Sequence, residues 1–212
     1  MAIQQKLETP TPPNLGYPPE LYERRNFNES NGALNAYFRK VTSVLGALFG
    51  VKGSRYINAP YGAFQSTADQ TAAAINTAYA MTFNVTDYTN GITVASNSRI
   101  TVTDSGIYNL QWSGQFENTD SQDHDVRVWI KINGTNLVGS TGFAGIPSKH
   151  GAVNGHTIIG WNYFLSLDAN DYAELWWETD STAVSIQAYA AASNYPSTAS
   201  LIATMQFVSN TM

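Results

Sequence analysis

Apolar side chains recur with a helical spacing in the first quarter of the chain. Seven positions between residues 27 and 48 are separated by 4, 3, 4, 3, 4 and 3 residues, an alternation that lets helices wind around one another. One of the seven is Asn31, and a polar residue on such a seam often fixes the register of the helices. We expect a coiled-coil stem, with an ordinary amphipathic helix packed on its own domain as the alternative. The predicted stem residues are Phe27, Asn31, Leu34, Phe38, Val41, Leu45 and Leu48.

The predicted helix spans about residues 20–50. Pro19 precedes it, and proline is common at the start of a helix. Gly50 and Gly53 supply plausible stops. Gly32 lies inside the segment and weakens the helix by about 1 kcal/mol relative to alanine, so the segment is expected to form either one helix or two.

From residue 56 onward, apolar and polar side chains alternate with a period of two, and turn sequences separate the runs. In GIYNLQWSGQFEN (residues 106–118) and VRVWIKING (residues 126–134), one face of each run is apolar. Further strands are predicted at residues 81–85, 91–94, 98–102, 135–139, 156–167, 172–179, 183–190 and 201–208. About ten short antiparallel strands in one segment predict a mainly β sandwich.

One predicted strand carries apolar residues on both faces. Between residues 158 and 167, Ile158 and Phe164 alternate with Trp161 and Leu165. One face would pack in the core of the sandwich. The other face is expected to lie in a subunit interface, because large exposed apolar patches are rare on soluble monomers.

Charge and proline content divide the chain at the same places. Residues 1–55 carry a net charge of +3 and the remainder carries −8, and five of the eight prolines lie within the first nineteen residues. We therefore expect an extended Pro-rich arm over residues 1–19, a helical stem and linker over 20–55, and a β domain over 56–212. A disordered tail is the alternative for the arm.

The composition excludes several classes of protein. The chain contains no cysteine, which rules out disulfide scaffolds, cysteine-ligated zinc and thiol catalysis. A net charge of −5 argues against a nucleic-acid-binding protein. No apolar run approaches the roughly 18 residues of a membrane-spanning helix, and the first residues lack the apolar stretch of a signal peptide.

Candidate chemistry is sparse, and we expect no enzyme, no catalytic residue, no cofactor and no metal site. The sequence has neither a nucleophile elbow nor carboxylates paired at a recognisable spacing. The acidic run at Asp120, Asp123 and Asp125 is expected to be a solvated turn, with a Ca²⁺ site as the alternative. The histidines lack the spacing of a zinc site. They are His124, His150 and His156.

Aromatic residues are the more informative candidates. In YAELWWETD, Tyr172 and Trp176 alternate with apolar residues of the opposite face. Three interpretations of Trp176 stay open: a subunit interface, the sandwich core, or stacking on a sugar of a host surface. The same interpretations apply to Trp129, which lies between two basic residues. The candidate interface or glycan contacts are Trp129, Trp161, Tyr172 and Trp176.

The order of motifs resembles the jelly roll of the C1q/tumour-necrosis-factor superfamily. The motifs with their likenesses in that family are YGAFQST (opening strand), DSGIYNLQWSGQF (Gly-x-Tyr strand), VWIKINGTNL (strand and Asn-Gly turn), YFLSLDANDYAELWW (strand, polar turn and aromatic strand) and SLIATMQFV (closing strand). Each motif is weak alone, but five in this order are fairly specific, and together they cover about residues 61–208.

Residues 148–151, 180–182 and 202–206 are similar to C1q-like domains in virion proteins of marine tailed phages, in which a helix precedes the jelly roll. The resemblance implies a homotrimer on the virion surface, either a short tail fibre or a knob. Residues 1–55 would anchor it to other virion proteins, and the jelly-roll head would face a host glycan or protein. A capsid decoration protein and a carbohydrate-binding adhesin module are the alternatives. The chain lacks the collagen repeat of animal C1q proteins, so complement-like roles do not transfer.

Overall fold

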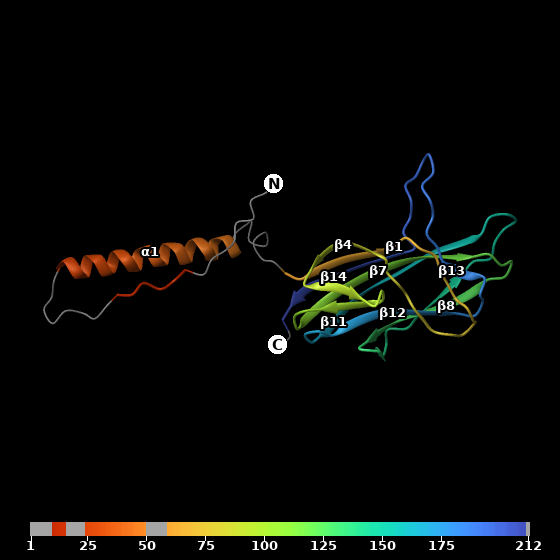
Figure 1. Cartoon of the computed structure of the whole chain (residues 1–212), viewed down its shortest axis with the longest axis horizontal. Coiled ribbons are helices and arrows are strands. Elements are labelled where there is room, and N and C mark those ends of the chain that lie inside the picture. Colours follow the sequence, from red (N-terminus) through yellow and green to blue (C-terminus); the bar gives the residue numbers. More distant parts are fainter. Residues whose placement is uncertain (1–9, 16–23, 50–58, 211–212) are drawn as a thin grey trace. The chain divides into compact units, whose positions relative to one another are not determined.

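The computed structural model of the chain describes residues 10–15, 24–49 and 59–210. The chain divides into two compact units, Met1–Asn58 and Ala59–Met212. The described residues form one helix and fourteen strands (Figure 1). Residues 10–15 of the predicted arm are neither helical nor extended in a sheet. The rest of the arm and the predicted boundary between residues 55 and 56 lie outside the described residues.

The helix α1 (Arg24–Phe49) contains 26 residues and runs without a break through Gly32. Of the two arrangements that the sequence allowed, the single helix is therefore present. One interior glycine costs only about 1 kcal/mol, which the hydrogen bonds of the flanking turns tolerate. An i,i+4 ion pair between Arg25 and Glu29, with 2.9 Å between Nε and Oε1, supports the first turns.

The first sheet contains seven antiparallel strands in the order β2-β13-β7-β14-β1-β4, and β11 pairs with β7 in addition. Its strands are β1 (Tyr61–Ser66), β2 (Gln70–Thr71), β4 (Val85–Asn90), β7 (Gly106–Asn118), β11 (Gly155–Leu167), β13 (Val184–Ile186) and β14 (Leu201–Ser209). β11 pairs with β7 along its whole length, while β14 and β13 share the opposite edge of β7.

The second sheet also contains seven antiparallel strands, in the order β10-β8-β12-β6-β5, and β3 and β9 pair with β12 and β8. Its strands are β3 (Tyr79–Ala80), β5 (Ile92–Ala95), β6 (Arg99–Val102), β8 (His124–Ile132), β9 (Thr135–Asn136), β10 (Gly142–Ile146) and β12 (Tyr172–Thr179). The predicted mainly β class is confirmed, and the two antiparallel sheets make a β-sandwich.

The core lies between the sheets and follows the predicted alternation. Tyr108 and Leu110 of β7, and Val126, Val128 and Ile130 of β8, are almost completely buried. Fully burying a large apolar side chain contributes about 1.5–3 kcal/mol, so these alternating positions account for much of the driving force for folding.

The aromatic part of the core is centred on Trp177 of β12. Its ring lies 5.8 Å from that of Phe116 and 6.3 Å from that of Tyr79, measured between centroids. The contact with Phe116 is edge-on, a geometry that stabilises aromatic pairs beyond the area they bury. Strands of both sheets are therefore joined through this one ring.

Two predicted strands have different bounds in the structure. Residues 81–85 were expected to form a strand, but only Val85 belongs to β4. The backbone N–H groups of Met81 and Phe83 donate to the carbonyls of Leu175 and Asn97, at 2.8 and 2.7 Å. Both side chains are buried, so the apolar character that predicted a strand reflects a connection that fills the core.

Residues 142–146 form β10, although the sequence around them predicts a glycine-rich loop. β10 pairs with β8 from Gly142↔Val128 to Ile146↔His124. Glycine weakens a strand unless another group needs close access to the backbone. Here the ring of Trp161 occupies the space in which a Cβ of Gly142 would lie.

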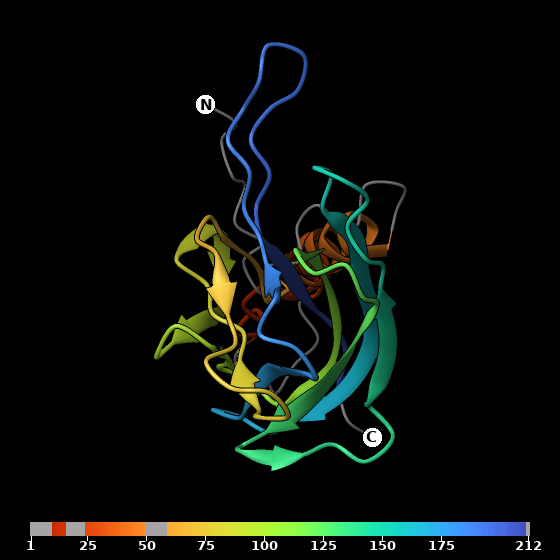
Figure 2. The ribbon, with the colours of Figure 1, turned by 90° about the vertical axis from the view of Figure 1, so that its right-hand side faces the viewer.

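A long hairpin projects from the sandwich between β13 and β14, and we call residues 187–200 the distal hairpin. Both views show it as a narrow blue loop that stands away from the sheets (Figures 1 and 2). Isolated bridges at Tyr189↔Thr198 and Ala192↔Tyr195 join its two sides. The predicted strand over residues 183–190 is therefore wrong beyond Ile186, where pairing with β7 ends.

The distal hairpin lies at the opposite end of the sandwich from the point at which the chain enters it. At its base, the N–H of Ser200 donates to the carbonyl of Ser66, the last residue of β1, at 2.8 Å. At the other end, the N–H of Phe207 donates to the carbonyl of Pro60 at 2.9 Å. The long dimension of β1 and β14 therefore separates the hairpin from the start of the domain.

Candidate functional site

The predicted stem residues lie on a continuous helix, and three of them are exposed in the single chain. Phe27, Phe38 and Leu45 are 54%, 59% and 46% exposed. Asn31 is exposed too, Leu34 and Val41 are half-buried, and the side chain of Leu48 lies outside the described residues. Phe38 and Leu45 are seven residues apart, so both lie on one side of α1.

The outward side of the first sheet is free of charged residues across three neighbouring strands. We call it the uncharged face and define it as the outward positions of residues 107–115 in β7, 158–166 in β11 and 202–206 in β14. These positions hold asparagine, glutamine, serine, threonine, glycine and three large apolar residues besides Ile107. The domain around the face carries a net charge of −8 over residues 56–212, so the absence of charge is local.

Large apolar side chains on the uncharged face are open to solvent. Ile158, Phe164 and Ile202 are 66%, 64% and 46% exposed, whereas Ile159 and Leu165 on the inner side of β11 are buried. The two-faced pattern of β11 thus places one apolar set in the core and leaves the other on the surface of the chain.

The outward side of the second sheet is aromatic, and we call it the aromatic face. Trp129 of β8 and Trp176 of β12 lie opposite each other in the register of the two strands. Both are half-buried, whereas the neighbouring Trp177 is 1% exposed. Trp176 therefore lies outside the core, while the interface and sugar-stacking interpretations stay open. Tyr172 and Phe143 complete the face.

Trp161 is separate from the other three aromatic candidates. Its side chain points to the inner side of β11, and its ring centroid lies 5.6 Å from that of Trp112. It also covers Gly142 of β10. The structure thus brings Trp129, Tyr172 and Trp176 together on one face and places Trp161 at the edge of the core.

Cations lie over the rings of the aromatic face. Lys131 Nζ is 3.5 Å from the ring centroid of Trp176, and Arg99 Cζ is 4.7 Å from that of Tyr172. The domain's third cation–ring pair joins Arg127 to Phe143, at 5.4 Å. Such pairs contribute about 0.5–1 kcal/mol at exposed sites and hold the rings in fixed orientations.

Two of these cations also pair with carboxylates. Arg127 Nη1 lies 2.7 Å from Glu178 Oε1, and Arg99 Nε lies 3.6 Å from Glu174 Oε1. The hydrogen bond from Arg127 to Glu178 raises the pKa of that guanidinium. Glu174 is buried beneath its neighbours and accepts a further hydrogen bond of 2.7 Å from Ser98 Oγ.

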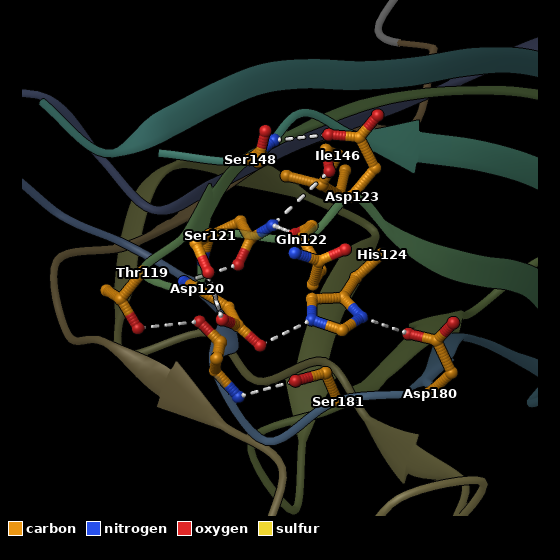
Figure 3. Close-up of polar contacts among 12 residues, drawn as sticks. Thr119, Asp120, Ser121, Gln122, Asp123, His124, Ile146, Ser148, Asp180 and Ser181 are labelled. Atoms are coloured by element: carbon orange, nitrogen blue, oxygen red, sulfur yellow. Dashed lines mark hydrogen bonds and ion pairs between the residues drawn. The ribbon is translucent and has the colours of Figure 1, made fainter. Parts of the chain in front are cut away.

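The acidic run singled out in the sequence forms a hydrogen-bonded loop around His124 (Figure 3). His124 Nε2 is 3.0 Å from Asp120 Oδ2, and its Nδ1 is 3.1 Å from Asp180 Oδ1. A histidine that donates from both ring nitrogens carries a positive charge. Asp123 instead accepts a backbone hydrogen bond of 2.7 Å from Ser148.

Hydrogen bonds to these carboxylates lower their pKa values. The ring of His124 is the main cause for Asp120, and the backbone N–H of Ser148 is the main cause for Asp123. The carboxylates are thus engaged in closing the loop. Within residues 10–15, 24–49 and 59–210, no three histidine or carboxylate side chains are grouped so as to hold a metal ion.

A polar cluster at the base of the distal hairpin was missed in the sequence. Tyr189 Oη donates to Glu117 Oε2 at 2.7 Å and lies 3.1 Å from His156 Nδ1. Burial, followed by the hydrogen bond to Glu117, raises the pKa of Tyr189. These residues come from three separate elements, so no local spacing signals them.

The other two histidines are not brought together. His150 forms an isolated bridge with Val153, whereas His156 contacts the ring of Tyr189. Next to Tyr189, a pocket of about 500 Å³ opens between the distal hairpin and the segment that follows β1. Its polar lining includes Gln65, Asp69 and Thr198.

Comparison with protein families and with curated proteins finds no match: neither a family model nor a curated sequence corresponds to this chain. A membrane crossing needs a longer apolar helical stretch than the described segments provide. What the chain does is therefore argued from its own faces and loops.

Proposed function

We propose that the chain is a structural protein of a tailed-phage virion, a homotrimeric short fibre or surface knob anchored by its N-terminal segment. The motif resemblance over residues 61–208 and the contrast between the two sheet faces support this proposal. In this role the protein acts by assembly and adhesion at the virion surface, without catalysis and without a cofactor. Its partners are its own copies, other virion proteins and a host surface.

The strand order supports a jelly roll as the finer description of the sandwich. The long strands of one sheet follow β1-β14-β7-β11, and those of the other follow β6-β12-β8-β10. The first long strand lies beside the last, and the chain crosses between the sheets at β6–β7, β7–β8, β10–β11 and β11–β12. Crossings of this kind are a feature of double Greek-key jelly rolls.

The uncharged face is the observation that carries the trimer. Charged residues are depleted at the centre of subunit interfaces, and a stable interface buries on the order of 800 Å² per partner. The uncharged face extends over three long strands and exposes Ile158, Phe164 and Ile202 within an acidic domain. Three copies packed through this face would remove these side chains from water.

Light scattering and native mass spectrometry of the full chain test the trimer. We expect a trimer at micromolar concentration, and a monomer would overturn the proposal. Phe164→Asp places a charge on the uncharged face and is expected to dissociate the sandwich domains. Phe143→Asp is the matched control, because Phe143 is 68% exposed against 64% for Phe164 and lies on the opposite sheet.

Attachment is proposed to reside in residues 1–19. Proline fixes φ, so a Pro-rich arm loses less conformational entropy on docking than a flexible one. Three arms per trimer would add avidity. A chain lacking residues 2–19 is expected to form a folded trimer that is absent from purified particles. Normal incorporation would place the attachment in the helix or in the sandwich.

Two alternatives are distinguished by location and by binding. Immunogold labelling of purified virions separates a fibre at the tail from a decoration protein on the capsid. The carbohydrate-binding adhesin is favoured by the aromatic face, where Trp129, Tyr172 and Trp176 lie together with basic side chains. An array of immobilised glycans tests that activity directly.

A further inference from the structure

Positive charge in the sandwich domain is concentrated on the aromatic face. Residues 59–212 contain four basic residues. Three of them, Arg99, Arg127 and Lys131, occupy outward positions of the second sheet, and the fourth, Lys149, follows β10. Twelve acidic residues in the same part of the chain make it strongly negative elsewhere. The aromatic face is thus the part of the domain best suited to meet an anion.

Lys131 differs from the two arginines in its pairing. Arg99 and Arg127 each have a carboxylate within 4 Å, at Glu174 and Glu178. Among the described residues, Lys131 has no ion pair, and its ammonium lies over the ring of Trp176. An anionic group can therefore approach Lys131 without displacing a carboxylate of this chain.

The rings beside Lys131 form a continuous platform. Trp129 and Trp176 are opposite each other on neighbouring strands, where side chains of one face lie about 5 Å apart. The indole N–H of Trp129 donates to Asn136 Oδ1 at 3.0 Å, and that of Trp176 lies 3.4 Å from Glu174 Oε2. These bonds fix the rings, so a ligand that stacks on them meets a rigid surface.

We propose that the aromatic face binds an acidic glycan, a saccharide that carries carboxylate, sulfate or phosphate groups. Trp129 and Trp176 contact the apolar C–H side of a sugar ring, and Lys131 binds its anionic group. A neutral saccharide would leave the charge of Lys131 without a counterpart, whereas an acidic one matches both the rings and the ammonium. This inference deepens the proposed adhesive role and rests on it, although binding itself does not require the trimer.

The binding experiment uses the full chain and three polysaccharides of known charge. Polygalacturonate supplies carboxylates, dextran sulfate supplies sulfates, and dextran is the neutral counterpart. Isothermal titration calorimetry and tryptophan fluorescence report binding. We expect binding to at least one of the acidic polymers, weakened by added salt because exposed charges are screened. Binding to dextran as strong as to both acidic polymers, or no binding to any of the three, would overturn the proposal.

Variants separate a local site from general electrostatics. Lys131→Gln is expected to weaken binding about tenfold, as loss of a charge-assisted contact does, whereas Lys149→Gln removes the same charge off the face and should leave affinity unchanged. Lys131→Arg should restore binding. Equal losses in the Lys131→Gln and Lys149→Gln variants would mean that the anion is attracted by overall charge, and this would overturn the site.

A second pair of variants tests the rings. Trp176→Leu is expected to weaken binding, and its thermal melting is compared with that of the wild type to confirm that the protein is folded. Trp129→Phe keeps an aromatic surface and should retain binding. Unchanged affinity in a folded Trp176→Leu protein would overturn the stacking role. Light scattering of the same samples keeps the two proposals apart: a trimer that fails to bind overturns only the glycan site, and a monomer that binds overturns only the trimer.

Discussion

The absence of a side chain at residue 142 determines how Trp161 packs. A Cβ at Gly142 would overlap the indole ring, which also lies against Trp112 and has little room to move. Gly142→Ala is therefore expected to destabilise the domain by about 1–3 kcal/mol, the usual cost of overpacking. Gly145→Ala on the same strand is the control, because its Cβ would have its nearest neighbour at 3.9 Å. Urea unfolding compares the two, and equal stability would contradict this packing.

The contact between Asp120 and His124 makes part of the stability depend on pH. The hydrogen bond from the His124 ring lowers the pKa of Asp120 below its ordinary value of 3.8. The resulting stabilisation is present above that ordinary value and is lost as pH falls through the lowered pKa. Asp120→Asn should therefore destabilise the protein at neutral pH, and the difference from the wild type should shrink at lower pH. Denaturant midpoints measured across the acid range test this, and a difference that grows on acidification would contradict it.

At the level of elements, the seam of α1 should matter to the stem alone. Leu34→Asp with Val41→Asp places charges at half-buried seam positions, at a cost of several kcal/mol when the seam is buried. Because an isolated helix is marginal in water, we expect lost helical circular dichroism and unchanged melting of the sandwich. Ala36→Asp with Ser43→Asp is the control, since both positions are exposed on the same helix. A lower melting temperature of the sandwich in the seam variant would assign α1 to that domain.

Strands with regular alternation could be predicted from the sequence, and irregular ones could not. β7 and β8 alternate because each has one side in the core, so their burial follows the sequence. β10 could not be found, because its glycines carry no pattern and its pairing depends on a tryptophan in another strand. The segment from Met81 to Phe83 is apolar for the opposite reason, since it fills the core without joining a sheet.

Side-chain clusters were harder to predict than strands. The alternation of β12 placed Trp176 and Tyr172 together, because both lie on one strand. Their cations come from β6 and β8, and only the pairing of those strands brings them over the rings. The contact of Tyr189 with Glu117 likewise joins residues 72 positions apart, so it depends on the complete fold.

At the level of the whole molecule, the two sheet faces should respond differently to salt. The uncharged face contains no charge to screen, whereas Arg99, Arg127 and Lys131 gather on the aromatic face. Raising sodium chloride to about 0.5 M should leave the trimer intact, because apolar burial is insensitive to screening and the Debye length is then only a few ångströms. Light scattering at both salt concentrations measures this, and dissociation at high salt would mean that ion pairs hold the subunits together.

The distal hairpin makes the domain a natural acceptor of foreign sequence. Its base is held by Tyr189 and Ser200, whereas residues 190–198 are exposed, and loop length adds little to the cost of closing a loop. An epitope of about eight residues inserted after Asn194 should lower stability by less than about 1 kcal/mol and be displayed at the end of the sandwich far from its entry point. The same insertion after Asn133, whose side chain binds Asp171 and the backbone of Tyr172, should be strongly destabilising. Thermal melting and antibody capture measure both variants.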